Sequence, residues 1–208
     1  MAKLKGPLFS LGATAQIGKT LVYFPWKGLN VVREYVVPSY RRTTPQAIQR
    51  DYFKAAVADI HEAMGLAAYP LNETDTTAYA LWASVVQAAT TWFNQAVRNF
   101  VDCNVLENDG TVFRSGQAVE ADTTLSVTVF SDEIDGTKIT AGKFFWGTTK
   151  TALIHSGAGG IDAEAHSANL LIEGLTNGVK YFWQFRVDTG EDCEGARSGI
   201  YHNTPVAA

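Results

Sequence analysis

Hydrophobic and polar residues alternate with two different periods along this chain, and the period changes near residue 110. Between residues 44 and 101, apolar residues recur at three- and four-residue spacing, which is typical of amphipathic helices. From residue 111 onward, apolar and polar residues alternate in short runs separated by Gly, Asn, Asp and Ser, which indicates short strands. We therefore expect an α+β N-terminal domain over residues 1–107 and an all-β domain over residues 108–208.

The N-terminal domain is predicted to contain a β-hairpin followed by a two-helix hairpin. Residues 20–24 and 29–37 form the two strands, and Pro25-Trp-Lys-Gly28 supplies the turn. A lone hairpin is marginally stable in water, so this one needs a partner surface, either the helices or another subunit. The basic start of the chain is part of this region, and we expect it to anchor the protein.

Helix signals appear twice after the hairpin. Thr44 and Pro45 begin the first helix, as N-cap and first helical residue, and Gly65 ends it. The second helix is predicted from about residue 77 to residue 101, with Asp75 or Thr76 as its cap. Its wide apolar stripe favours packing on both the first helix and the hairpin.

Seven short strands are predicted in the C-terminal domain, a number and spacing typical of a β-sandwich. They cover residues 111–119, 125–130, 143–146, 152–155, 168–173, 179–187 and 196–202. Gly157-Ala-Gly-Gly160 is interpreted as a flexible loop between two of them.

The segment 170–187 contains Gly174-Leu175-x-x-Gly178-x-x-Tyr181, followed by alternating large residues. This pattern resembles the E–F corner of fibronectin type III domains. The resemblance implies that the Tyr181 hydroxyl bonds back to the corner backbone, so that Tyr181, Gly178 and Leu175 form a structural corner. It implies an immunoglobulin-like sandwich that binds or presents rather than catalyses.

Two further segments extend this resemblance over about residues 111–206. Residues 144–153 look like the C strand and its turn, and residues 198–205 look like the closing G strand. The expected B strand, residues 125–130, lacks the tryptophan that these domains often bury. We expect Trp146 or Trp183 to fill the core instead.

Charge is divided unevenly along the chain. Residues 1–50 carry eight Lys or Arg and one acid, a net +7, whereas the rest carries nine basic and twenty acidic residues, a net -11. The basic part could contact nucleic acid or membrane phosphate, but its charges are interspersed with aromatic and Val residues. This favours docking on an acidic neighbour, including another copy of the chain. The interface candidates are Tyr23, Phe24, Trp26, Lys27, Arg33, Arg41 and Arg42.

Residues 1–60 resemble proteins of tailed bacteriophages and prophages, on Lys5-Gly-Pro-Leu-Phe-Ser10, Trp26-Lys-Gly-Leu-Asn-Val-Val-Arg33 and Thr44-Pro-Gln-Ala-Ile-Gln-Arg50. Together with the fibronectin-like part, this implies a non-enzymatic virion structural protein. It would anchor and self-associate through its N-terminal half and display its sandwich as a decoration or adsorption module. Expected partners are other virion proteins, itself, and a glycan or protein of the host surface. Alternatives are a nucleic-acid-associated protein and a carbohydrate-binding accessory module.

Motifs for catalysis or cofactors are weak. Gly12–Thr20 lacks the glycine that a phosphate-binding loop needs at position 13, which is alanine. A shallow metal site at Asp162, Glu164 and His166, with His155 nearby, is less favoured than a solvated loop. We therefore expect no catalytic residue, cofactor or metal.

Cys103 and Cys193 are the two cysteines, and two idle buried thiols are favoured over a disulfide between them. Neither cysteine belongs to a CxxC motif or to a Cys/His spacing that suits structural zinc. The chain has no apolar run of membrane-spanning length, and its start lacks the apolar stretch of a secretory signal. We expect synthesis in the host cytoplasm and a place in the virion.

Overall fold

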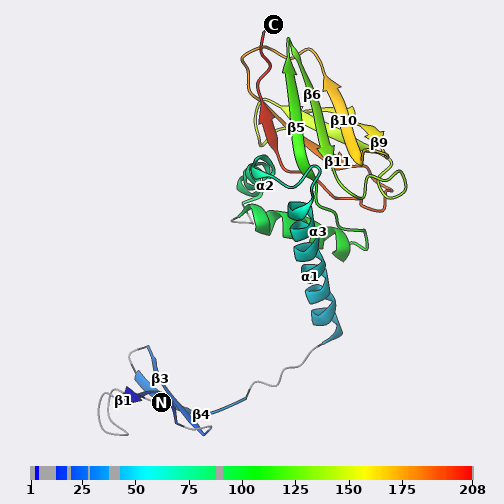
Figure 1. Cartoon of the computed structure of the whole chain (residues 1–208). Helices are drawn as coiled ribbons and strands as arrows, with labels where there is room; N and C mark the ends of the chain where they lie inside the picture. Colours follow the sequence, from blue (N-terminus) through cyan, green and yellow to red (C-terminus); the bar gives the residue numbers. More distant parts are fainter. Residues whose placement is uncertain are drawn as a thin grey trace. The chain divides into compact units, whose positions relative to one another are not determined.

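The computed structural model describes residues 3–4, 13–17, 20–27, 29–37, 43–87 and 91–207 (Figure 1). Contacts within the chain divide it into two compact units, residues 1–43 and 44–208. The predicted boundary between residues 107 and 108 lies inside the second unit. The helices there bond directly to the segments that follow them, as between the Ile200 N–H and the Ala78 carbonyl, 3.0 Å apart.

The first unit contains a four-stranded antiparallel sheet whose strands neighbour one another in chain order. The strands are β1 Lys3–Leu4, β2 Ala13–Ile17, β3 Leu21–Trp26 and β4 Leu29–Glu34. In the β3–β4 pair, Tyr23 lies opposite Val32, and Phe24 lies opposite Val31. Because side chains alternate along a strand, these two pairs occupy opposite faces of the sheet.

The second unit begins with three helices, so the two-helix prediction is wrong. They are α1 Thr44–Gly65, α2 Glu73–Val86 and α3 Trp92–Val105. The predicted helix over residues 77–101 is interrupted because Gln87 adopts a left-handed conformation (φ 57°) and caps α2. Thr91 then starts α3 by accepting a hydrogen bond from the Asn94 N–H, 3.2 Å away.

The start of α2 also differs from the prediction. Asn72, rather than Asp75 or Thr76, is the N-cap, and its side-chain oxygen accepts the Asp75 N–H. The Asp75 carboxylate in turn accepts the Asn72 N–H at 2.9 Å, which completes a reciprocal capping box. Asp75 is therefore the third residue of the helix, and its carboxylate is free to reach beyond α2.

Two four-stranded antiparallel sheets follow the helices. The first has the order β5-β6-β10-β9, with β5 Arg114–Ala121, β6 Thr124–Phe130, β10 Ser167–Ile172 and β9 Gly160–Asp162. The second has the order β12-β11-β7-β8, with β12 Tyr201–Asn203, β11 Tyr181–Val187, β7 Gly142–Gly147 and β8 His155–Ala158. β10 and β11 belong to different sheets, so the segment between them crosses from one sheet to the other.

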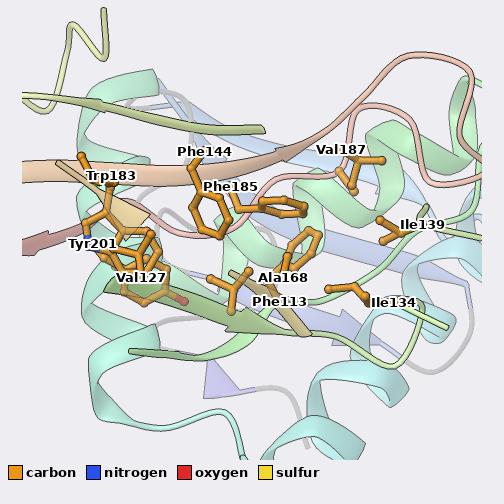
Figure 2. Packing of buried hydrophobic residues seen from close by; sticks show 14 of the residues in the cluster. Phe113, Val127, Ile134, Ile139, Phe144, Ala168, Trp183, Phe185, Val187 and Tyr201 are labelled. Atoms are coloured by element: carbon orange, nitrogen blue, oxygen red, sulfur yellow. The ribbon is translucent and has the colours of Figure 1, made fainter. Parts of the chain in front are cut away.

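Both sheets contribute to one hydrophobic core (Figure 2). Val127 comes from the first sheet, whereas Phe144 and Phe185 come from the second and lie with ring centres 4.9 Å apart. Trp183 is 1% exposed and stacks on Tyr201. Trp183 is therefore the one of the two candidate tryptophans, Trp146 and Trp183, that lies buried in the core. The described residues form a mixed α+β fold with a β-rich C-terminal part.

The expected flexible loop at residues 157–160 is strand instead. Gly157 lies in β8 and Gly160 in β9, and the chain passes between the two sheets at this point. A Cβ on Gly157 would lie 3.0 Å from Leu170, and one on Gly160 would lie 3.0 Å from Asn169. Gly157 thus lies close to a side chain of the other sheet and Gly160 close to a side chain of its paired strand, a crowding that the sequence pattern alone did not distinguish from flexibility.

A buried carboxylate joins α2 to the sheets. Asp75 is fully buried and accepts hydrogen bonds from the Ser115 N–H (2.7 Å), the Gly116 N–H (2.8 Å) and the Tyr201 hydroxyl (2.7 Å). Nearby, a Cβ on Gly199 would lie 2.6 Å from the Ala78 Cβ, so glycine allows the chain to pass close to the helix. These contacts make α2 part of the same unit as the sheets.

Candidate assembly surface

The apolar stripe of α1 is covered along only half of the helix. Ala56, Ile60 and Ala63, in the second half, are buried in the core that α1 shares with α2 and α3. In the first half, Ile48 is 43% exposed and Phe53 is 52% exposed. Figure 1 shows the first half of α1 extending beyond α3 within the second unit. We call residues 44–55 the uncovered half of α1.

The sheet of the first unit also leaves apolar side chains exposed. Trp26, the last residue of β3, is 60% exposed, and Val32 on β4 is 47% exposed. Val36 and Val37, directly after β4, are exposed too. Trp26 and Val32 occupy opposite faces, because Val32 lies opposite Tyr23 and Trp26 is three residues further along β3. Both faces of the sheet thus present apolar side chains to solvent.

The interface candidates predicted from the sequence are placed differently from one another. Trp26, Lys27 and Arg33 are exposed, whereas Tyr23 is buried and cannot itself form a surface. Phe24 is half-buried, and the Arg33 guanidinium lies over its ring, 5.3 Å from the ring centre. Arg41 and Arg42 lie outside the described residues.

Charge differs between the two units. Residues 1–43 carry seven basic residues and one acid, and residues 44–208 carry ten basic and twenty acidic residues. The uncovered half of α1 carries Arg50, Asp51 and Lys54, which nearly balance, and Lys54 lies 4.0 Å from Asp51. Two copies of this helix face would therefore repel each other weakly, in contrast to the acidic surface of the sheets and loops.

The predicted structural corner contains the backbone contact that the resemblance implied. The Tyr181 hydroxyl accepts a hydrogen bond from the Thr176 N–H, 3.2 Å away. Gly178 has a φ of 76°, and its N–H donates to the Pro205 carbonyl at 2.9 Å. Leu175 is buried in the core between the sheets. The corner thus stabilises the crossing from β10 to β11.

The residues considered as metal ligands make local contacts instead. Asp162 accepts hydrogen bonds from the backbone N–H groups of Glu164 and Ala165. The Nδ1 atom of His166 lies 3.0 Å from the Ile134 carbonyl, and His155 stacks on Trp146. Within the described part of the chain, no group of three or more His, Cys, Asp or Glu is arranged to hold a metal ion.

The two cysteines are poorly suited to nucleophilic chemistry. Cys103 and Cys193 are buried and not joined by a disulfide. Burial raises the pKa of the Cys103 thiol to about 11 and that of the Cys193 thiol to about 12. Both thiols stay protonated near neutral pH, and the thiolate is the reactive form.

Thr20 is followed by strand β3, although a phosphate-binding loop would place a helix there; Gly18 and Lys19 lie outside the described residues. Helices within the described ranges are too short or too polar to span a bilayer.

No protein-family model matches this sequence, and a search of curated proteins gave no match either.

Proposed function

We propose that this chain is a non-enzymatic structural protein of a bacteriophage particle. It self-associates through the uncovered half of α1 and the N-terminal sheet, and it presents the C-terminal sheets as an immunoglobulin-like module. The observation that carries the proposal is the apolar stripe of α1, which is buried from Ala56 to Ala63 and exposed at Ile48 and Phe53.

The partner on α1 is a second copy of the chain. An isolated helical segment of this length is marginal in water, so the uncovered half needs packing to be well stabilised. A two-fold pair needs one patch that is complementary to itself, and the continuing stripe supplies it. The charges on the uncovered half of α1 nearly balance, so two copies of it repel each other less than two copies of an acidic surface of the second unit would.

The strand order supports the immunoglobulin-like part of the proposal. When the strands from β5 to β12 are lettered A, B, C, C′, D, E, F and G, the sheets have the orders A-B-E-D and G-F-C-C′. Immunoglobulin-like sandwiches place A, B, E and D in one sheet and C, F and G in the other. The Tyr181 hydroxyl contact at the E–F crossing adds to this support. A fold of this kind does not define a reaction.

Light scattering after size exclusion tests self-association of the full chain. We expect an oligomer that persists at high salt, because the proposed contact is apolar. The Ile48→Asp and Phe53→Asp double variant should be monomeric. Ile154→Asp, which changes an even more exposed apolar residue of the same unit, is the control and should leave the oligomer intact.

A monomeric wild-type chain, or a double variant that associates like wild type, would contradict this role of α1.

The same samples should also be mixed with duplex DNA. The positive charge of residues 1–43 makes nucleic-acid binding the second candidate function. A monomer that binds DNA with a steep salt dependence would replace the assembly proposal. Mass spectrometry of purified particles from cells that produce the protein tests the virion role directly, because a structural protein copurifies with them.

A further inference from the structure

A cavity of about 290 Å³ lies among the C-terminal half of α2, α3 and the segment before β12. Its apolar lining includes Trp82 of α2 and Leu106, which directly follows α3. Two carboxamide residues of α3, Gln95 and Asn99, also line it, one helical turn apart. Every residue of this cavity belongs to the second unit, and none is part of the proposed assembly surface.

Gln95 is the unusual residue of the cavity. It is 2% exposed, and its Oε1 atom has no hydrogen-bond partner among the described residues. Asn99 is 7% exposed and adds a second buried carboxamide. Leaving a buried acceptor unpaired destabilises a fold, and such groups are rare in native structures. The Oε1 atom is closed off from water in this conformation, but the Gln95 side chain lines the cavity, so a rotation of the carboxamide would let a donor in the cavity satisfy it.

The rim of the cavity is positive, although the second unit as a whole is acidic. Arg98, Arg197 and Asp102 line it, a net charge of one positive, and Arg98 lies 3.4 Å from the carboxylate of Asp102. Arg197 is exposed, and no Asp or Glu within the described ranges lies at ion-pair distance from it. Arg197 also pairs with Arg186 across an isolated β-bridge. Burial, and then the positive charge of Arg197, lowers the pKa of Arg186. Arg197 is therefore a cation without a neutralising carboxylate.

We propose that this cavity binds one acidic sugar ring, that is, a monosaccharide unit that carries a carboxylate. Hydroxyl groups both donate and accept, so they match the carboxamides of Gln95 and Asn99. The carboxylate would bind the Arg197 guanidinium, and the apolar edge of the ring would lie on the Trp82 and Leu106 lining. The cavity volume is at the lower end of small-molecule sites, which suits one ring rather than a chain of them.

Titration of the full chain with glucuronate, glucose and acetate tests this chemistry. For a ligand of this size, we expect glucuronate to bind with a dissociation constant on the order of 1 mM. Glucose lacks the carboxylate and acetate lacks the hydroxyls, so each should bind at least about tenfold more weakly. Equal binding of glucose or acetate, or no glucuronate binding up to about 20 mM, would overturn the proposal.

Variants separate a ligand-binding role of Gln95 from a structural one. Gln95→Met keeps the approximate size but removes the unpaired acceptor, so it should raise the melting temperature while weakening glucuronate binding at least about tenfold. Unchanged binding, or a lowered melting temperature, would contradict the proposal, because either result gives Gln95 an ordinary packing role.

Arg197→Ala should weaken glucuronate binding by about tenfold and leave the weak binding of glucose unchanged. Lys180→Ala, which removes another exposed positive charge of the same unit, is the matched control and should bind like wild type. An equal loss in both variants would show a general charge effect and would contradict the site. Failure of these tests leaves the assembly proposal untouched, because that proposal depends on α1 and on the light-scattering result.

Discussion

The junction between α2 and the sheets differs from the uncovered half of α1 in how completely its groups are satisfied. At the junction, four hydrogen bonds reach the Asp75 carboxylate, and Ser115 and Tyr201, which supply two of them, are buried. In the uncovered half of α1, large apolar residues such as Ile48 and Phe53 face solvent. Both regions belong to the same unit. The difference shows that polar groups are satisfied where α2 meets the sheets, whereas the first helix leaves large apolar side chains exposed.

The largest expected effect comes from Asp75→Ala. This change leaves three backbone N–H groups and the Tyr201 hydroxyl without their buried acceptor. We expect the free energy of unfolding to fall by about 4 kcal/mol, measured by urea denaturation. The exposed neighbour Glu73→Ala is the control and should change it by less than about 0.5 kcal/mol. Similar losses in the two variants would show that Asp75 does not join α2 to the sheets.

A second test compares the two halves of α1 directly. Ile60→Ala in the buried half should lower the free energy of unfolding by about 3 kcal/mol at any protein concentration. Ile48→Ala should change it by less than about 0.5 kcal/mol in dilute protein, where the chain is dissociated. Its effect should grow as the concentration rises, because association stabilises the folded chain. An Ile48 effect that is independent of concentration would contradict self-association through α1.

The stability of the covered part of α1 should depend on pH through Asp59. Burial raises its pKa to about 6, with further contributions from Asp132, Glu133 and Glu62. The folded pKa exceeds the unfolded one, so the folded state binds the proton more tightly, and stability falls as the pH rises from about 4 to 6. Since part of the group is exposed, we expect Asp59→Asn to stabilise the protein by about 1–2 kcal/mol at pH 7 and to flatten this slope.

Urea denaturation across this pH range measures the Asp59 effect. Asp51→Asn changes an exposed carboxylate in the uncovered half of α1, so it should keep the wild-type slope. A wild-type slope in Asp59→Asn as well would show that other groups cause the pH dependence.

The smallest expected effect compares a tyrosine hydroxyl at the corner between the sheets with one in the uncovered half of α1. Tyr181→Phe removes the acceptor of the Thr176 N–H and should lower the free energy of unfolding by about 1 kcal/mol. Tyr52→Phe in the uncovered half of α1 should change it by less than about 0.5 kcal/mol in dilute protein. Thermal unfolding of both variants measures the difference, and equal shifts would argue against a stabilising corner.

Local sequence signals were sufficient where neighbouring residues decide the structure. The start of α1 was predicted to within one residue, since Thr44 is its first residue rather than its N-cap, and its end at Gly65 was predicted, because a helix start and a helix end depend on residues within one turn. The alternating runs likewise located β6 and β11. The interruption between α2 and α3 was missed, because the apolar periods of two successive helices continue one another across it. Asn72 was overlooked although the Asn72-x-x-Asp75 spacing carries a capping signal.

The candidate sites were less predictable. Trp26, Arg33 and Tyr23 were all predicted as interface residues from residue type and position. Trp26 and Arg33 are exposed, but Tyr23, on the same strand as Trp26, is buried. Gln95 and Asn99 lie four residues apart within a largely apolar helix, a spacing that indicates two polar groups on one otherwise apolar face. The fact that Gln95 lacks a partner depends on which groups α2 and the β12 segment bring near it.

The sequence by itself determined the spacing of apolar residues, the approximate limits of α1 and the alternation of most C-terminal strands. It also determined that the first unit is basic and the second acidic. These follow from spacing along the chain, which the covalent backbone fixes. Tertiary structure decided which faces are covered and which polar groups are paired. Asp75 and Tyr201 are 126 residues apart, and their contact depends on the packing of α2 against β5 and β12. Packing among the three helices covers Ile60 and leaves Ile48 exposed, and α2, α3 and the segment before β12 give Gln95 a cavity rather than a partner.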